Sequence, residues 1–324
     1  MAHRPARLVS LETLAWVALL PMLGLCLTQW FGIEGHRAIA AFQALTPWVL
    51  VWALPIALAA AVSGRHLLAL TALVPLGTLL VLSYPIMFHA DAPKVADDSP
   101  QLTIAYANLL YSNPVPADAA QALLEADADV MVMVELDTTL YDAMVRATTP
   151  GDYPYRSERT DLGSESIGVW SRLPIQAGGL VLVDDRPTID LALDVDGDSV
   201  RVLAVHPYPP TRNAIGWSRQ LRTIGERAAD STLPTIVLGD FNGSRWHPSF
   251  RALLATGLRD SQEALGHGWG VSWPTDSGIM PPPFVRIDHA LFGDGMTPLA
   301  IADLDAPGSD HKGFVVTFGF TKAA

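Results

Sequence analysis

Long uncharged segments dominate the first ninety residues of the chain. Asp, Glu, Lys and Arg are absent from three of them, which cover residues 13–33, 38–64 and 66–90. A helix rises about 1.5 Å per residue, so roughly 20 apolar residues cross a hydrocarbon core about 30 Å thick. Each segment is therefore long enough to span a membrane.

These segments predict a transmembrane domain over residues 1–90. We expect its three helices at about 10–31, 38–62 and 66–89. A cleaved signal peptide is the alternative for the first segment. Its uncharged run, however, is longer than the usual apolar core of about 7 to 15 residues, and two more spans follow. The rest of the chain is then expected to be anchored to a membrane.

Basic residues in the short flanks predict the orientation of the spans. Arg4 and Arg7 precede the first span and Arg65 lies between the second and third, whereas Arg37 stands near Glu34 in the first loop. An excess of basic residues marks the cytoplasmic side. The N-terminus is therefore expected in the cytoplasm. Three crossings then place the remaining chain outside the cell membrane, as part of a multi-pass protein.

The pattern changes after the predicted spans. Residues 91–100 are polar and contain proline, which is typical of a short linker. Over residues 101–324, extended and helical patterns alternate, and hairpin-like pairs of extended segments follow the first two helices. This mixture indicates an α/β domain in which two packed sheets are flanked by helices.

Six polar motifs in this domain each lie at the edge of an apolar run. Strands that end at one rim of a sheet deliver side chains in this way, so we expect the polar residues to lie close together. They are Asn108, Glu135, His206, Asp240 with Asn242 in Gly-Asp-Phe-Asn, Asp288, and Asp310 with His311 in Ser-Asp-His.

The residue types in these motifs predict their chemistry. Carboxylate and carboxamide oxygens suit a hard divalent cation such as Mg²⁺. An imidazole paired with a carboxylate suits proton transfer or the stabilisation of charge on a phosphoryl group. A turn or a helix cap would explain Asn108 or Asp240 alone, but not all six motifs in order. The motifs therefore favour a metal-dependent phosphohydrolase.

The order and residues of the motifs resemble those of the endonuclease/exonuclease/phosphatase superfamily, which includes DNase I-like nucleases, inositol polyphosphate phosphatases and bacterial sphingomyelinases. The resemblance covers roughly residues 101–320, and its most specific part is Gly-Asp-Phe-Asn together with Ser-Asp-His. It implies a four-layer α/β/β/α sandwich of the DNase I-like kind.

The resemblance also implies which residues hold a metal. Asn108 and Glu135 match the family positions that bind it, and Asp310 matches a further carboxylate on the metal side. The implied cofactor is Mg²⁺, with Mn²⁺ as an alternative.

The remaining motifs match catalytic positions of the family. Asp240 and Asn242 match the residues that position the attacking water and stabilise the transition state. Asp288 matches the buried carboxylate that orients the terminal histidine, here His311.

One of the six motifs, His206, has a further match in the family, and three further residues are candidates beside the motifs. His206 aligns with the second family histidine, and Glu165 lies where nucleases of the family place the partner of that histidine. Arg212 follows the His206 loop and Arg245 follows the Gly-Asp-Phe-Asn motif. Both arginines are candidates for binding a substrate phosphate.

Charge and domain order bear on the substrate. The formal net charge is −12, and the sequence shows no stripe of basic residues that could bind along a nucleic-acid backbone. Nucleic acid is therefore not an expected partner. Three spans followed by this domain resemble the teicoplanin-resistance membrane proteins of actinomycetes. That resemblance implies a membrane-lipid partner and a lipid-linked phosphate or diphosphate of the cell envelope as substrate. The alternatives are a membrane-anchored extracellular nuclease or phosphodiesterase, and a catalytically inactive phospholipid-sensing module.

Overall fold

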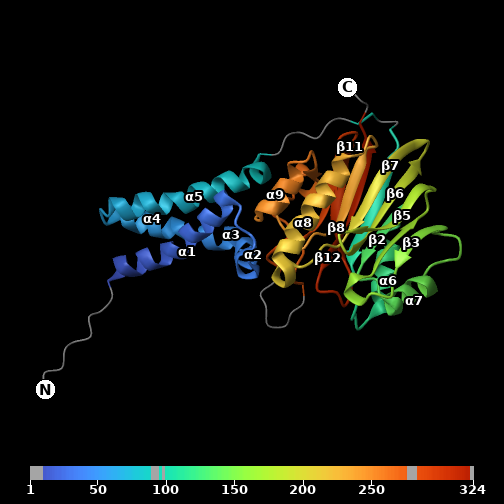
Figure 1. The fold of residues 1–324 in the computed structure, drawn as a ribbon, viewed down its shortest axis with the longest axis horizontal. Helices are drawn as coiled ribbons and strands as arrows, with labels where there is room; N and C mark the ends of the chain where they lie inside the picture. Colours follow the sequence, from blue (N-terminus) through green and yellow to red (C-terminus); the bar gives the residue numbers. More distant parts are fainter. Residues whose placement is uncertain (1–9, 89–94, 97–98, 276–282, 322–324) are drawn as a thin grey trace, which may run out of the picture.

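The computed structural model describes residues 10–88, 95–96, 99–275 and 283–321. An apolar helical part built from the N-terminal residues projects from a larger α/β part (Figure 1). The predicted linker, 91–100, lies largely outside the described residues, and the predicted domain boundaries stay predictions. The fold class of the larger part agrees with the sequence prediction.

Two six-stranded sheets form the centre of the described α/β part. The first sheet has the strand order β11-β12-β1-β2-β4-β3, and β1 and β2 run parallel while the other neighbours run antiparallel. Its strands are β1 (Gln101–Asn108), β2 (Val130–Val134), β3 (Tyr155–Arg159), β4 (Ile167–Ser171), β11 (Met296–Asp305) and β12 (Lys312–Phe320).

The second sheet has the order β5-β6-β7-β8-β10-β9, with β7 and β8 as its parallel pair. Its strands are β5 (Ile175–Val183), β6 (Arg186–Val195), β7 (Asp198–Val205), β8 (Thr235–Asp240), β9 (Arg259–Asp260) and β10 (Asp288–Phe292). Each sheet thus repeats one arrangement, in which a parallel pair is flanked by antiparallel strands.

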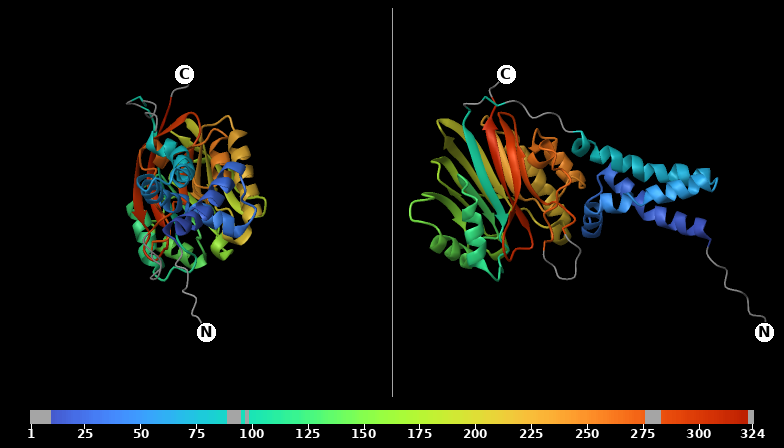
Figure 2. Two further views of the ribbon diagram at one scale, coloured as in Figure 1. Left: turned by 90° about the vertical axis from the view of Figure 1, so that its left-hand side faces the viewer. Right: turned by 180° about the vertical axis from the view of Figure 1, so that it is seen from behind.

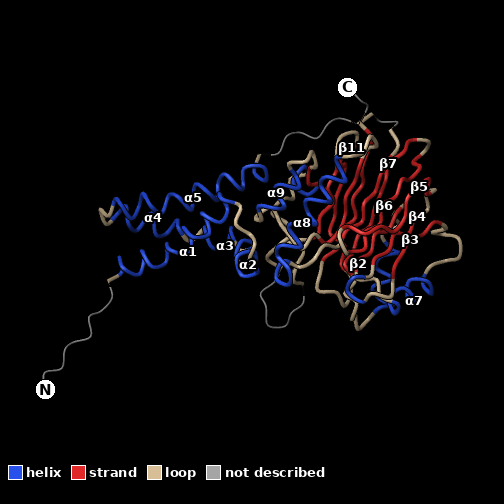
Figure 3. The backbone as a smooth tube through the Cα atoms, viewed as in Figure 1, coloured by secondary structure: helices blue, strands red, loops and turns tan. Residues whose placement is uncertain are grey.

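The sheets pack face to face, and helices cover both outer faces, as Figures 2 and 3 show. Strand β2 explains why the layers form: Val130, Val132 and Val134 enter the core between the sheets, while Met131 and Met133 pack under helices. A strand buried on both faces needs such a continuous apolar run. The helices over the first sheet are α6 (Pro116–Glu125) and α7 (Thr138–Ala147), and those over the second are α8 (Pro210–Ala229) and α9 (Pro248–Leu254). Two short helical segments, η1 (Gly163–Glu165) and α10 (Ser261–Ala264), complete the α/β part of the described chain. The result is the expected four-layer α/β/β/α sandwich.

Five apolar helices make up the described N-terminal part, α1 (Leu11–Phe31), α2 (Arg37–Ala44), α3 (Thr46–Leu50), α4 (Ala53–Val62) and α5 (His66–Met87). Among the described residues, α1 and α5 are long and apolar enough to cross a membrane, and a bent pair of helices would make a third span. This agrees with the prediction of transmembrane helices.

The second expected span, 38–62, is not one continuous helix. Its two parts, Arg37–Ala44 and Thr46–Val62, meet at an angle of 69°. Pro47 causes the break because it has no N–H to donate to the carbonyl of Gln43, and its ring disfavours a continuous helix. The Thr46 hydroxyl donates to that carbonyl instead, at 2.6 Å. Helix α2 therefore turns away from the direction of α4 and packs against α8 (Figure 1).

Candidate active site

The strand order brings the first two motifs together at one rim of the first sheet. Asn108 ends β1 and Glu135 follows β2, and because these strands are parallel neighbours their carboxyl ends meet. The Asn108 amide nitrogen donates to a Glu135 carboxylate oxygen at 3.3 Å. The other Glu135 oxygen accepts from the backbone N–H of Tyr111 at 3.0 Å.

The second sheet supplies three further motifs, which lie beside Asn108 and Glu135. Asp240 ends β8, and His206 follows the parallel neighbour β7. Asp288 begins β10, which runs antiparallel to β8, and lies directly opposite Asp240 in the register. Asn242 lies two residues beyond β8 in a left-handed backbone conformation with φ of 49°, and its amide nitrogen donates to the Pro207 carbonyl at 3.2 Å.

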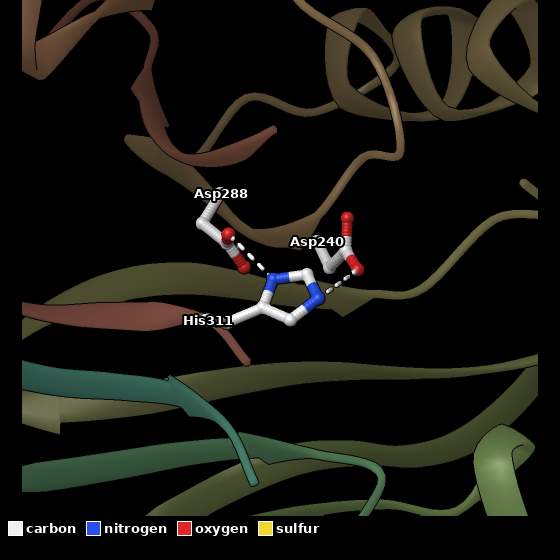
Figure 4. A group of neighbouring side chains, drawn as sticks. All are labelled: Asp240, Asp288 and His311. Atoms are coloured by element: carbon white, nitrogen blue, oxygen red, sulfur yellow. Dashed lines mark hydrogen bonds and ion pairs between the residues drawn. The ribbon is translucent and has the colours of Figure 1, made fainter. Parts of the chain in front are cut away.

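His311 lies between two buried carboxylates, as Figure 4 shows. Its Nδ1 is 2.8 Å from Asp288 Oδ2, and its Nε2 is 3.8 Å from Asp240 Oδ2. The Tyr106 hydroxyl donates to the other Asp288 oxygen at 2.7 Å. Asp288 is thereby held by two partners, and it fixes the orientation of the imidazole.

A bridge between the sheets completes the cluster. The Asn108 amide nitrogen lies 3.2 Å from Asp240 Oδ2, in addition to its contact with Glu135. His206 Nε2 lies 3.6 Å from the same Asp240 oxygen. All of these groups are buried except Glu135, which is partly exposed. The structure thus brings Asn108, Glu135, His206, Asp240, Asp288 and His311 together, although they come from both sheets.

The two histidines differ in charge because their surroundings differ. Burial alone would lower the pKa of His311, but the carboxylates of Asp288 and Asp240 outweigh it and raise this pKa to about 10. Burial, and then the positive charge of Arg186, lower the pKa of His206 to about 3. At neutral pH, His311 is therefore an imidazolium and His206 a neutral imidazole.

The carboxylates also separate into two kinds. Burial, with the neighbouring charge of Asp288, raises the pKa of Asp240 to about 7, and burial also raises the pKa of Glu135. Burial would raise the pKa of Asp288 too, but the charge and hydrogen bond of His311 hold it below its ordinary value. Asp288 is thus neutralised by His311, whereas Glu135 and Asp240 lack a cation of comparable strength.

This donor set fits a divalent cation. One atom from each of Asp240, Asp288 and His311 lies within 4.8 Å of the others, which is close enough for a shared ion. Asp288 and His311 are already bonded to each other, however, so the carboxylates of Glu135 and Asp240, between which the Asn108 amide nitrogen lies, form the better oxygen site. Hard cations such as Mg²⁺ and Mn²⁺ prefer such oxygen ligands.

Asp310 lies at the edge of the cluster. Its Oδ2 accepts a hydrogen bond from the Trp273 indole N–H at 3.0 Å, and its Oδ1 lies 3.9 Å from His311 Nε2. Its charge contributes to the raised pKa of Glu135, although burial contributes more. Asp310 therefore lies at the edge of the cluster and affects Glu135 through its negative charge.

Two of the substrate-binding candidates occupy different places from those expected. Arg245 pairs with Glu263, both largely buried, and it does not line the pocket that contains Asp240. Glu165 pairs with Arg186 rather than with His206, whose Nδ1 has no hydrogen-bond partner among the described residues. Neighbouring positions in the sequence do not fix the direction of a side chain in a loop, so these contacts differ from those expected, and a role of either residue in substrate binding stays a prediction.

Arg212 does line the catalytic pocket, as does Arg186, which the sequence did not single out. Arg186 is 3 % exposed, donates from Nε to the His206 carbonyl at 3.2 Å and stacks over the Tyr208 ring. Nothing in its local sequence marks it. Tyr106 was also missed, but it lies two residues before Asn108, so the period of a strand places both side chains on the same face.

The pocket above the cluster has a volume of about 610 Å³. Glu135, His206, Asp240, Asn242 and His311 line its polar part. A four-layer sandwich with buried acid, amide and imidazole groups at the strand ends defines a metal-dependent phosphohydrolase.

The sequence model described as Endonuclease/Exonuclease/phosphatase family matches residues 105–311, and the chain belongs to this family. Its members are metal-dependent phosphoesterases and nucleases, and the protein is an enzyme of that class. The family match agrees with the resemblance seen in the motifs. A comparison with curated protein sequences finds no match.

Solved structures share this fold at low sequence identity. TDP2 from D. rerio in complex with a single-stranded DNA product is 18% identical with a TM-score of 0.58, over 68% of this chain and 99% of that one. The mannosyl-6-phosphatase of Bacteroides thetaiotaomicron is 20% identical with a TM-score of 0.55, over 68% and 100%.

Proposed function

We propose that the protein is a membrane-anchored, extracytoplasmic, Mg²⁺-dependent phosphohydrolase that acts on a lipid-linked phosphate or diphosphate. The observation that carries this proposal is the attachment of the apolar helices beside the catalytic pocket. Trp48 in α3 donates from its indole N–H to the Phe284 carbonyl at 2.9 Å, and Gln29 in α1 donates to the Trp246 carbonyl at 2.7 Å. A substrate that resides in the membrane therefore meets the active site at the membrane surface.

The residues of the cluster have distinct roles in this proposal. Glu135 and the side-chain oxygen of Asn108 would hold a divalent cation beside Asp240, with Asp310 as a carboxylate at the rim. Asn108 would do so with its amide turned over, because its nitrogen faces Glu135 and Asp240 in this structure. Such a cation, when bound, would supply positive charge against a nonbridging phosphate oxygen. Asp288 keeps His311 protonated and oriented, so that this imidazolium stabilises negative charge on the phosphoryl group together with Asn242 and His206.

Asp240 is the proposed base because His311 is already protonated. It aligns the attacking water and takes its proton while the water oxygen forms a bond to phosphorus. The bond between phosphorus and the leaving oxygen breaks, and the leaving oxygen receives a proton from solvent. Arg212 contacts the phosphate oxygens that face the mouth of the pocket.

Two features favour a lipid over a polymer as the source of the phosphate. The formal net charge of −12 opposes a polyanion such as DNA. The Trp246 ring packs against Leu82 and Ile86 of α5 and beside Trp269, which gives the catalytic part aromatic residues next to the helices. Tryptophan is the residue type that prefers membrane interfaces.

The comparisons support two substrate classes. Similarity to a mannosyl-6-phosphatase supports hydrolysis of a phosphomonoester, and similarity to TDP2 bound to a single-stranded DNA product supports a phosphodiester or a nucleic-acid end. The second class is the alternative function, a membrane-anchored nuclease or phosphodiesterase. The resemblance to teicoplanin-resistance membrane proteins favours the first class through an envelope lipid.

A substrate panel tests the proposal. Full-length protein in lipid nanodiscs with Mg²⁺ is given a polyprenyl diphosphate, a soluble sugar phosphate and single-stranded DNA, and released phosphate or cleaved DNA is measured. We expect the lipid diphosphate to have the highest kcat/KM, and faster cleavage of DNA would support the alternative. The orientation is tested separately by fusing a reporter that fluoresces only in the cytoplasm after Ala324, and this fusion should stay dark.

A further inference from the structure

Helix α2, from the N-terminal apolar part, forms one wall of the catalytic pocket. Ala40, Ala41 and Ala44 of this helix line the pocket together with Leu45, which follows it. Ala41 is exposed and Ala44 is half-buried, so both present their methyl groups to the open space. This wall exists because the break at Pro47 turns α2 out of the line of α4.

A buried histidine fixes α2 in this position. His247 Nε2 lies 3.0 Å from the Ala40 carbonyl, and His247 Nδ1 accepts from the backbone N–H of Ser244 at 3.0 Å. A carbonyl only accepts and an N–H only donates, so the imidazole is neutral with its proton on Nε2. Burial lowers the pKa of His247 to about 4, in agreement with this form. The ring contacts Trp217 edge to face, which holds it in place.

The remaining walls make the pocket amphipathic. Pro209 and Pro210 lie on the α8 side, and Phe284, Val285 and Ile287 approach from the segment before β10. Together with the α2 wall, these apolar residues line the same pocket as Glu135, Asp240 and His311. Such a shape fits a ligand with a charged head and an apolar chain, because each part then lies against groups of its own kind.

We infer that α2 and Leu45 form a binding subsite for the first hydrocarbon segment attached to the phosphate, so that the N-terminal apolar part contributes directly to substrate recognition. This inference rests on the proposed function and specifies the part of the substrate next to the scissile group. The subsite selects an unbranched or isoprenoid chain over a nucleoside or a sugar. A sugar or base at this place would leave its polar groups without partners beside the alanine methyl groups.

The position of α2 also explains how a chain enters. Helix α2 lies at the end of the N-terminal bundle that faces the α/β part, as Figure 1 shows. A chain that left the pocket along α2 would run towards the apolar surface of the bundle. Apolar contact along this path stabilises the complex by roughly 25 cal/mol for each Å² of apolar surface removed from water.

Polar substitution of the wall tests the inference. The full-length protein in lipid nanodiscs, with Mg²⁺, is given hexadecyl diphosphate or ethyl diphosphate, which share a head group and differ in chain length. The variant carries Ala41→Asn and Ala44→Asn, which add polar groups without charge. We expect its ratio of kcat/KM for hexadecyl over ethyl diphosphate to fall at least about tenfold, which equals the burial of about two methylene groups.

Two controls separate a local effect from a general one. Ala41→Leu keeps the wall apolar and should retain the chain-length preference. Ala117→Asn places the same polar group on the exposed first turn of α6, at a residue that does not line the pocket, and should behave like the parent. An unchanged ratio in the double variant, or a parent that hydrolyses both substrates equally well, overturns the inference while leaving the phosphohydrolase proposal intact.

A labelling experiment gives a readout that does not depend on turnover. An alkyl diphosphate with a photoreactive group on its chain is irradiated with the parent protein, and labelled peptides are identified by mass spectrometry. We expect label on the segment of residues 37–45, displaced by excess hexadecyl diphosphate. Label there without hydrolysis of any diphosphate would overturn the proposed function and retain the subsite. Absence of label from this segment would overturn the subsite.

Discussion

The carboxylate of Glu34 accepts a hydrogen bond from the backbone N–H of Ser249 at 2.7 Å, and it also accepts one from the Ser249 hydroxyl. Glu34 lies in the loop between α1 and α2, and Ser249 lies in the first turn of α9. A helix N-terminus has free N–H groups and attracts negative charge. The N-terminal part therefore caps a helix of the α/β part, and the two are joined through a specific polar contact as well as through apolar packing.

Glu34→Ala should weaken this junction. Hydrogen bonds to a charged group contribute about 1.5 to 3 kcal/mol, so we expect a lower midpoint of thermal unfolding in detergent. Glu34→Gln retains an acceptor and should lie between the parent and the alanine variant. If the alanine variant unfolds at the parental temperature, the contact contributes nothing to the stability of the fold.

Glu135→Ala should reduce turnover by about 10² or more, because the variant lacks the carboxylate that we assign to the metal. Chelation should abolish activity of the parent, and Mg²⁺ or Mn²⁺ should restore it. The concentration of Mg²⁺ that gives half-maximal activity should be higher in Glu135→Gln, which keeps the shape but not the charge. Titration of Mg²⁺ against initial rate measures this. Identical titrations for parent and variant would remove Glu135 from the metal site.

Asp288→Asn should lower kcat by about 10² while leaving the protein folded, because His311 loses the carboxylate that orients and charges it. Tyr106→Phe removes only one hydrogen bond to Asp288, so its effect should be smaller. Steady-state kinetics of the two variants measures this order. Asp240→Ala and His311→Ala should each cost at least as much as Asp288→Asn. Parental kcat in Asp288→Asn would show that His311 does not depend on this pair.

The two arginines next to the motifs should behave differently. Arg212→Ala should raise KM by about tenfold, since Arg212 lines the catalytic pocket and a hydrogen bond between charged groups is worth about 1.5 kcal/mol or more. Arg245→Ala should leave KM unchanged but lower the midpoint of thermal unfolding, because buried Glu263 loses its partner. The reverse result would return Arg245 to the substrate.

The layers of the fold and most of the site were predictable from the sequence, since both depend on local patterns. Apolar runs mark strands such as β2 and β8, and a polar residue at the end of each run marks the rim. Parallel neighbours then bring Asn108 to Glu135 and His206 to Asp240 without further information.

Contacts between distant segments were not predictable in this way. The opposition of Asp288 and Asp240 depends on the register of two strands that are far apart in the sequence. The pairing of Arg245 with Glu263 depends on the direction of a loop. The turn at Pro47 brings α2 over the pocket, whereas composition predicted only that this segment is apolar.

A buried pair outside the catalytic cluster gives the last prediction, which concerns stability and pH. Asp260 contacts His289 Nδ1 at 2.6 Å and caps α10 by accepting from the Gln262 N–H at 2.9 Å. Burial would raise the pKa of Asp260, but the charges of Arg286 and His289 hold it well below its ordinary value. The unfolded chain has an aspartate pKa of about 3.9. The stabilising effect is therefore complete above that pH and is lost as the pH falls below it.

Asp260→Asn should cost about 3 to 5 kcal/mol at neutral pH, because the partners stay buried without their carboxylate. Its thermal midpoint should also fall less than that of the parent as the pH is lowered from neutral to below the unfolded aspartate pKa of about 3.9. Asp294→Asn, which alters an exposed carboxylate, is the matched control and should follow the parent across the same range. Parallel midpoint curves for Asp260→Asn and the parent would show that this pair does not contribute to acid sensitivity.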